Sequence, residues 1–67
     1  MAKFRTKYQE VADRTIASHP MRTFVWHGNR LFWRTHKGWL ELVVSCTASW
    51  FRASEETTEI LNKENPE

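Results

Sequence analysis

The fold is decided by residues 22–46, which read RTFVWHGNRLFWRTHKGWLELVVSC. Apolar and polar residues alternate along this stretch with a period of two, and aromatic and β-branched residues are frequent, as in β-strands. Two glycine-containing pairs, Gly28-Asn29 and Lys37-Gly38, interrupt the alternation. Such pairs favour tight hairpin turns because glycine adopts positive φ without strain. The stretch therefore predicts three antiparallel strands joined by two hairpins.

The two turns predict a register. Around Gly28-Asn29, His27 is placed opposite Arg30, and around Lys37-Gly38, His36 is placed opposite Trp39. Counting outward from either turn assigns the same side chains to one core face: Phe24, Trp26, Leu31, Trp33, Leu40, Leu42, Val44 and Cys46, interrupted by Thr35. A slip of one residue in either hairpin would mix the two faces, so the alternation supports this assignment.

The opposite face mixes cations with aromatic rings. It carries Thr23, Val25, His27, Arg30, Phe32, Arg34, His36, Trp39, Glu41, Val43 and Ser45. Nucleic-acid-binding surfaces use this combination, because rings stack on bases and guanidinium groups hold phosphates. We therefore predict a nucleic-acid site composed of Arg30, Phe32, Arg34, Trp39, His27 and His36, assisted by Lys3, Arg5 and Lys7. With this face open, Phe32→Ala is expected to cost much less stability than Trp33→Ala.

Several alternatives to an open nucleic-acid surface remain. The N-terminal helix covers this face in one of them, with Phe32 and Val43 in a second small core and Arg34 paired with Glu41, and two short helices would cover both faces. The same patch suits a protein partner, since tryptophan and arginine dominate protein–protein hot spots, so a small protein-binding regulator or inhibitor is the alternative function. A third alternative is a homodimer whose interface is a strand edge or the open patch.

Helices are expected on both sides of the strands. Apolar residues recur at helical spacing from Thr6 to Ser18, where Thr6 and Gln9 fit a capping box and His19-Pro20 ends the helix. Before Thr6 the residues alternate as a strand would, so the helix is assigned only after Thr6.

The C-terminal part of the sequence has weaker patterns. Ser49–Arg52 extends the third strand, forms a short fourth strand or packs as a loop. Ser54 fits the N-cap of a second helix, with Glu55 and Glu56 in its first turn, and Asn65-Pro66 ends it. The expected architecture is a small α+β domain over residues 1–67, with residues 64–67 as a frayed tail.

Length and composition exclude several classes of protein. The chain has 67 residues, too few for a large enzyme fold. Its single cysteine has no partner for a disulfide, and the longest uncharged stretch, residues 42–51, is half of the roughly 20 residues that span a membrane. The basic first residues lead into no apolar run, so no secretory signal is expected and the predicted location is cytoplasmic.

Charge is divided unevenly along the chain. The net charge is +2, but residues 1–37 carry +6 and residues 38–67 carry −4. A basic half favours an anionic partner, nucleic acid first, because bound cations displace condensed counterions. Alternatively, the two halves neutralise each other in the folded protein.

Neither a metal site nor a catalytic site is expected. His19, His27, His36 and Cys46 lie eight, nine and ten residues apart, whereas structural zinc ligands come in closely spaced pairs. Cys46 is expected to be buried and therefore unreactive. We predict no enzymatic activity and no cofactor.

The element order over residues 22–63 resembles that of sheet-reading DNA-binding domains of the integrase amino-terminal type. The size of the chain is similar to that of small phage or mobile-element regulators. Both likenesses concern order and size alone, and no motif assigns a family.

Overall fold

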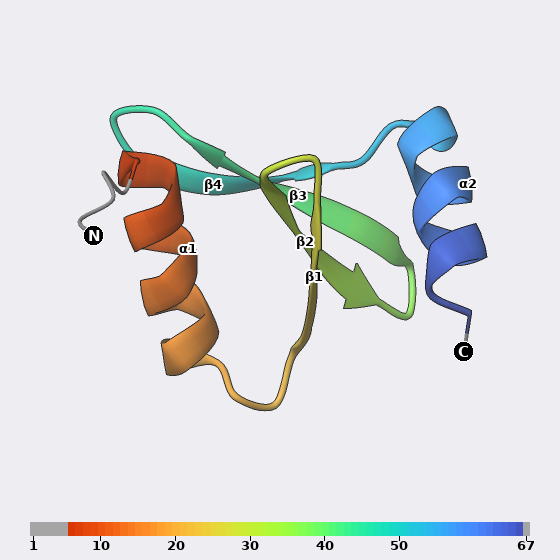
Figure 1. Cartoon of the computed structure of the whole chain (residues 1–67), viewed down its shortest axis with the longest axis horizontal. Helices are drawn as coiled ribbons and strands as arrows, with labels where there is room; N and C mark the ends of the chain where they lie inside the picture. The colour runs from red at the N-terminus through yellow and green to blue at the C-terminus, as the bar shows by residue number, and fades with distance from the viewer. Residues whose placement is uncertain (1–5, 67) are drawn as a thin grey trace, which may run out of the picture.

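A four-stranded antiparallel sheet lies between two helices (Figure 1). The computed structural model describes residues 6–66, and its elements are α1 (Lys7–Ser18), β1 (Thr23–His27), β2 (Arg30–Thr35), β3 (Gly38–Val44), β4 (Ala48–Arg52) and α2 (Glu55–Glu64). The strands are ordered β1-β2-β3-β4, so each pairs with its neighbour in sequence. The predicted α+β class is confirmed, and the segment that sequence left open forms a fourth strand.

Both helices begin at the predicted caps. The Thr6 hydroxyl accepts a hydrogen bond from the Gln9 N–H, and the Gln9 side chain accepts one from the Thr6 N–H. The Ser54 hydroxyl accepts from the Thr57 N–H at the start of α2. At the other end of α2, the Asn65 N–H donates to the Leu61 carbonyl, so a residue predicted to fray is held in place.

The first hairpin has the predicted register, with His27 opposite Arg30. Gly28 and Asn29 adopt φ of 58° and 64°, the positive values that a type I′ turn requires at both central positions.

The predicted register of the second hairpin is wrong by two residues. Thr35 pairs with Gly38 and Arg34 with Trp39, so His36 and Lys37 form the turn. The Thr35 hydroxyl accepts a hydrogen bond from the Lys37 N–H and donates one to the Gly38 carbonyl. These bonds place the two central turn residues at positions 36–37, one position before the predicted 37–38. Because the shift is an even number of residues, every side chain keeps its predicted face.

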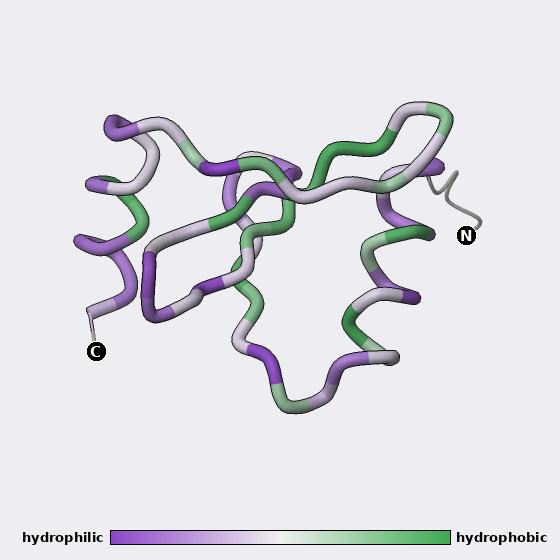
Figure 2. The backbone as a smooth tube through the Cα atoms, turned by 180° about the vertical axis from the view of Figure 1, so that it is seen from behind, coloured by the Kyte–Doolittle hydropathy of each residue, from purple (hydrophilic) through white to green (hydrophobic). Residues whose placement is uncertain are grey.

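Each face of the sheet is covered by one helix (Figure 1). On the α1 face, the buried residues Ala12, Leu31 and Leu42 form a cluster against which Tyr8, Val11, Ile16, Phe24, Val44 and Trp50 pack. On the α2 face, the second cluster contains Phe32, Trp39, Ala53 and Leu61, with Val25 packed against it. Figure 2 shows hydrophobic and hydrophilic residues alternating along both helices, as expected when one side of each is buried.

The expectation of an open second face is therefore wrong. Phe32 and Trp39 are each 2% exposed and lie in the cluster beneath α2. The arrangement is the alternative in which two short helices cover both faces. Cys46 was also assigned incorrectly: it lies exposed in the loop between β3 and β4 and is not in the core.

Truncation of Phe32 tests this two-sided core. We expect Phe32→Ala to lower the free energy of unfolding by about 3–5 kcal/mol, because it empties a fully enclosed site. Trp33→Ala should cost less, since Trp33 is only partly buried and belongs to neither cluster. Urea denaturation of both variants measures the ranking, and a larger loss for Trp33→Ala would contradict the burial of Phe32.

The two hairpins diverge at one end of the sheet. Direct pairing of β2 with β3 ends at Phe32 and Glu41. Beyond that pair the Tyr8 hydroxyl lies between the strands, accepting from the Leu31 N–H at 2.9 Å and donating to the Leu42 carbonyl at 2.6 Å. The Tyr8 side chain of α1 thus takes the place of a direct backbone hydrogen bond between β2 and β3. Burial raises the pKa of the Tyr8 hydroxyl above its ordinary value of 10.0, and the hydrogen bond from Leu31 partly opposes this shift.

Removal of this hydroxyl should leave two backbone groups without their partner. We expect Tyr8→Phe to lower the free energy of unfolding by about 1–3 kcal/mol at neutral pH. Equal stability of the variant and the wild type in urea would show that the bridge contributes nothing.

The same residue predicts an alkaline effect. The folded state holds the proton more tightly than the unfolded state, so the contribution of Tyr8 is fully present below pH 10.0 and is lost as pH rises through the folded pKa. Tyr8 is the only tyrosine in the chain, so Tyr8→Phe is the matched control for this loss. In denaturation curves, the wild type should be more stable than Tyr8→Phe below pH 10.0, and the two should converge as pH rises through the folded pKa.

Candidate functional site

The aromatic part of the predicted site holds α2 in place. The Trp39 Nε1–H donates to the Asn62 side chain at 2.8 Å. The Arg34 guanidinium lies 4.7 Å from the centroid of the Trp39 ring and donates to the Asn65 carbonyl. These groups join the sheet to the helix, so Phe32, Trp39 and Arg34 do not present a surface for stacking on bases.

Two more predicted residues contact carboxylates. The His27 Nδ1 lies 3.4 Å from a carboxylate oxygen of Glu64 in α2, and its ring meets Phe32 edge-on. Arg30 forms an ion pair with Glu41 across the divergent end of the sheet, although its side chain remains 63% exposed. The predicted pairing of Arg34 with Glu41 is therefore replaced by Arg30 with Glu41.

The remaining predicted residues lie apart from these. His36 and Lys37 are exposed in the β2–β3 turn, and Lys7 is exposed at the start of α1. Lys3 and Arg5 lie outside the described residues. The structure therefore does not bring the predicted site together as one surface.

A different cationic surface lies on the α1 face. The registers place Phe24, Trp33, Leu40 and Arg52 in one row across the four strands. Phe24 packs in the cluster under α1, whereas neither Trp33 nor Leu40 belongs to a core cluster among residues 6–66. At this end of the row the sheet extends beyond the cover that α1 provides.

Cations surround this open end. The Arg22 guanidinium lies 4.0 Å from the centroid of the Trp33 ring, and Trp50 meets the same ring edge-on at 5.6 Å between centroids. Arg52 lies opposite Leu40, and the β2–β3 turn adds two further basic residues. We call this surface the cationic end, and it consists of Arg22, Trp33, His36, Lys37, Leu40 and Arg52. Within residues 6–66, no carboxylate forms an ion pair with its arginines or its lysine.

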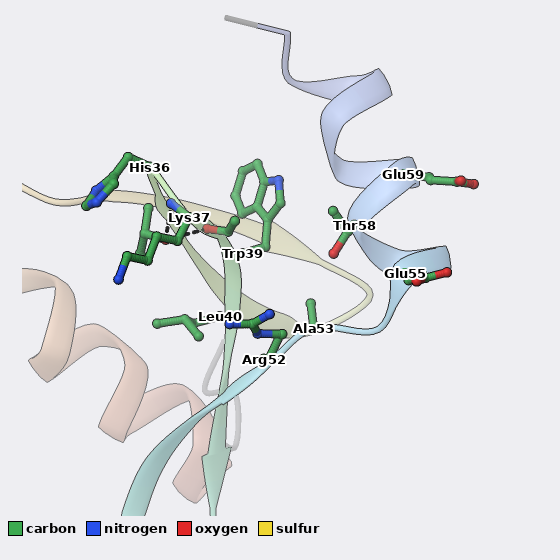
Figure 3. Close-up of a pocket in the computed structure, with 11 residues that line it drawn as sticks. His36, Lys37, Trp39, Leu40, Arg52, Ala53, Glu55, Thr58 and Glu59 are labelled. Carbon is green, nitrogen blue, oxygen red and sulfur yellow. Dashed lines mark hydrogen bonds between the residues drawn. The ribbon is translucent and has the colours of Figure 1, made fainter.

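A hollow of about 590 Å³ adjoins the cationic end (Figure 3). Trp39, Leu40 and Ala53 give it an apolar lining, and Arg52 and Lys37 contribute to its wall. Glu55 and Glu59 of α2 also border it, but Figure 3 shows their side chains directed away from Trp39. The acidic helix therefore limits the cationic end on one side, and within residues 6–66 neither glutamate forms an ion pair with Arg52 or Lys37.

Of this surface, sequence reasoning placed only His36 in the predicted site, for a specific reason. Arg22, Trp33, Leu40 and Arg52 belong to the predicted core face or lie outside the predicted strands. The pairing of Arg52 with Leu40 depends on the β3–β4 register, which the sequence left open. The twelve-residue length of α1 was the available signal, because a short helix cannot cover four strands.

No other chemistry is assembled in the described part of the chain. Among residues 6–66, no three histidine, cysteine, aspartate or glutamate side chains gather closely enough to hold a metal ion. Neither α1 nor α2 has the length and apolar content that a membrane-spanning helix requires.

Comparison with known proteins gives no relative. No protein family, curated protein or solved structure matches the chain.

Proposed function

We propose that this protein binds nucleic acid through the cationic end of its sheet. The observation that carries the proposal is that Arg22, Lys37 and Arg52 surround an uncovered part of the sheet without forming ion pairs with described carboxylates. Clustered cations of this kind gain free energy when they replace the counterions condensed on a phosphate backbone.

Phosphate contacts would supply most of the affinity. The Arg22 guanidinium stacks on Trp33, and such a stack leaves the N–H groups at its edge available for phosphate oxygens. A base could stack on that side of the ring only by displacing the guanidinium. We therefore expect affinity that depends strongly on salt and little on base sequence.

The charge of α2 would orient the ligand. The helix carries Glu55, Glu56, Glu59 and Glu64 against one lysine, Lys63. A phosphate backbone is repelled by this helix and attracted by the opposite side of the hollow. The ligand is therefore expected to run over the α1 face, away from α2.

Paired arginine substitutions test the proposal. Arg22→Ala combined with Arg52→Ala should weaken binding at least about tenfold and reduce the slope of log affinity against log salt by roughly 1.8 on duplex DNA, if each arginine neutralises one phosphate. Fluorescence anisotropy with labelled single-stranded and duplex oligonucleotides at several salt concentrations gives both quantities. Circular dichroism verifies that the variant is folded.

Arg14→Ala combined with Lys63→Ala is the matched control. It removes the same net charge from exposed positions on α1 and α2. We expect this variant to bind nearly as well as the wild type. Equal weakening by both double variants would show that net charge alone is responsible, and no binding by the wild type at about 50 mM salt would reject a nucleic-acid partner.

A further inference from the structure

The backbone of β4 is free along one edge. β4 is the last strand of the sheet, and among residues 6–66 it pairs with β3 alone. The Ala53 N–H donates to the Trp39 carbonyl, and hydrogen-bonded pairs alternate along an antiparallel ladder. The backbone groups of Ser49 and Phe51 therefore face β3. Those of Ala48, Trp50 and Arg52 face outward, in the sheet plane.

This edge has little of the usual protection against pairing, since Arg52 at its end is the one charged residue of the strand. Proteins protect edge strands with charges, prolines, bulges or covering segments. Residues 48–51 contain no charge and no proline, and the β3–β4 pairing runs without a bulge. Beside the edge, Phe51 is 57% exposed and Val43 is 36% exposed on a part of the α2 face outside the core cluster.

The other edge strand is more completely covered. Phe24 packs in the cluster under α1, and Val25 packs in the cluster under α2. Trp26 meets Tyr8 edge-on, and His27 contacts Glu64. Thus both helices reach β1, although Trp26 on this strand is 44% exposed.

We propose that a second copy of this chain pairs with the free edge of β4, so that the two sheets form one eight-stranded antiparallel sheet. The two-fold axis passes beside Trp50, which lies opposite the partner's Trp50. This register pairs all five strand residues and makes six hydrogen bonds from the outward-facing groups. Two come from the Trp50 pair, and four come from the two pairs of Ala48 with the partner's Arg52. Moving the register by two residues in either direction loses pairs within the strand.

Side chains fit this register. Arg52 lies opposite the partner's Ala48, so no like charges meet, and Phe51 lies opposite the partner's Ser49 with the partner's Phe51 as its diagonal neighbour. The exposed phenylalanines are thus brought together at the centre of the seam. The two helices cover opposite faces of the sheet, so in the joined sheet α1 of both copies lies on one face and α2 of both copies on the other.

Sedimentation equilibrium without nucleic acid tests the dimer. Between about 1 µM and 1 mM protein, we expect the wild-type mass to rise from that of a monomer toward that of a dimer. Ala48→Lys should weaken association at least tenfold, because it places a lysine opposite the partner's Arg52. Thr23→Lys makes a similar change on exposed β1 and should leave association unaltered.

A second substitution at Ala48 tests the same pairing in case the lysine of Ala48→Lys disturbs the fold of β4. Ala48→Pro removes an outward-facing N–H without removing a hydrogen bond to β3, so it should also give a monomer with an unchanged circular dichroism spectrum. A wild-type protein that remains monomeric at the highest concentration would overturn the proposal. Dissociation by Thr23→Lys but by neither Ala48 variant would also overturn it, because the seam would then lie at β1. Neither result affects the test of nucleic-acid binding.

Discussion

The Tyr8 hydroxyl connects three parts of the structure, namely α1, β2 and β3. It binds the backbone of β2 and the backbone of β3 at the point where direct pairing between the hairpins has ended. Its ring belongs to the cluster under α1, so the same residue fixes the helix to the sheet. The divergence of the hairpins is stable because a hydroxyl can both accept and donate, which satisfies one N–H and one carbonyl with a single group.

The faces of the sheet were predictable because side chains alternate strictly along a strand. This parity survived an error of two residues at the second turn, where the Thr35 hydroxyl determines the closure. The alternation of side chains does not predict which apolar face a helix covers. Phe32 and Trp39 are as apolar as Leu31 and Leu42, and only the path of α2 after Ala53 determines that they are buried.

The functional surface was less predictable for the same reason. Arginine beside an aromatic ring indicates either a binding surface or a packing contact, and this protein contains both arrangements. Arg34 over Trp39 secures α2, whereas Arg22 over Trp33 lies where neither core cluster extends. The chemistry of the two pairs is equivalent, and their difference is the presence of a helix above one of them. A helix of ten residues on one face and of twelve on the other leaves different ends of the sheet open.

The strand order also has a kinetic consequence. Because every strand pairs with the strand that follows it, the whole sheet forms through contacts between residues close in sequence. Proteins of low contact order fold rapidly, since little loop entropy is lost before each contact forms. The tie between Tyr8 and Leu42 spans 34 positions and is among the few that require a distant closure. The contact of His27 with Glu64 in α2 joins residues similarly far apart, so docking of either helix carries the entropic cost of a long closure, and the preformed sheet offers each helix a surface on which to pack.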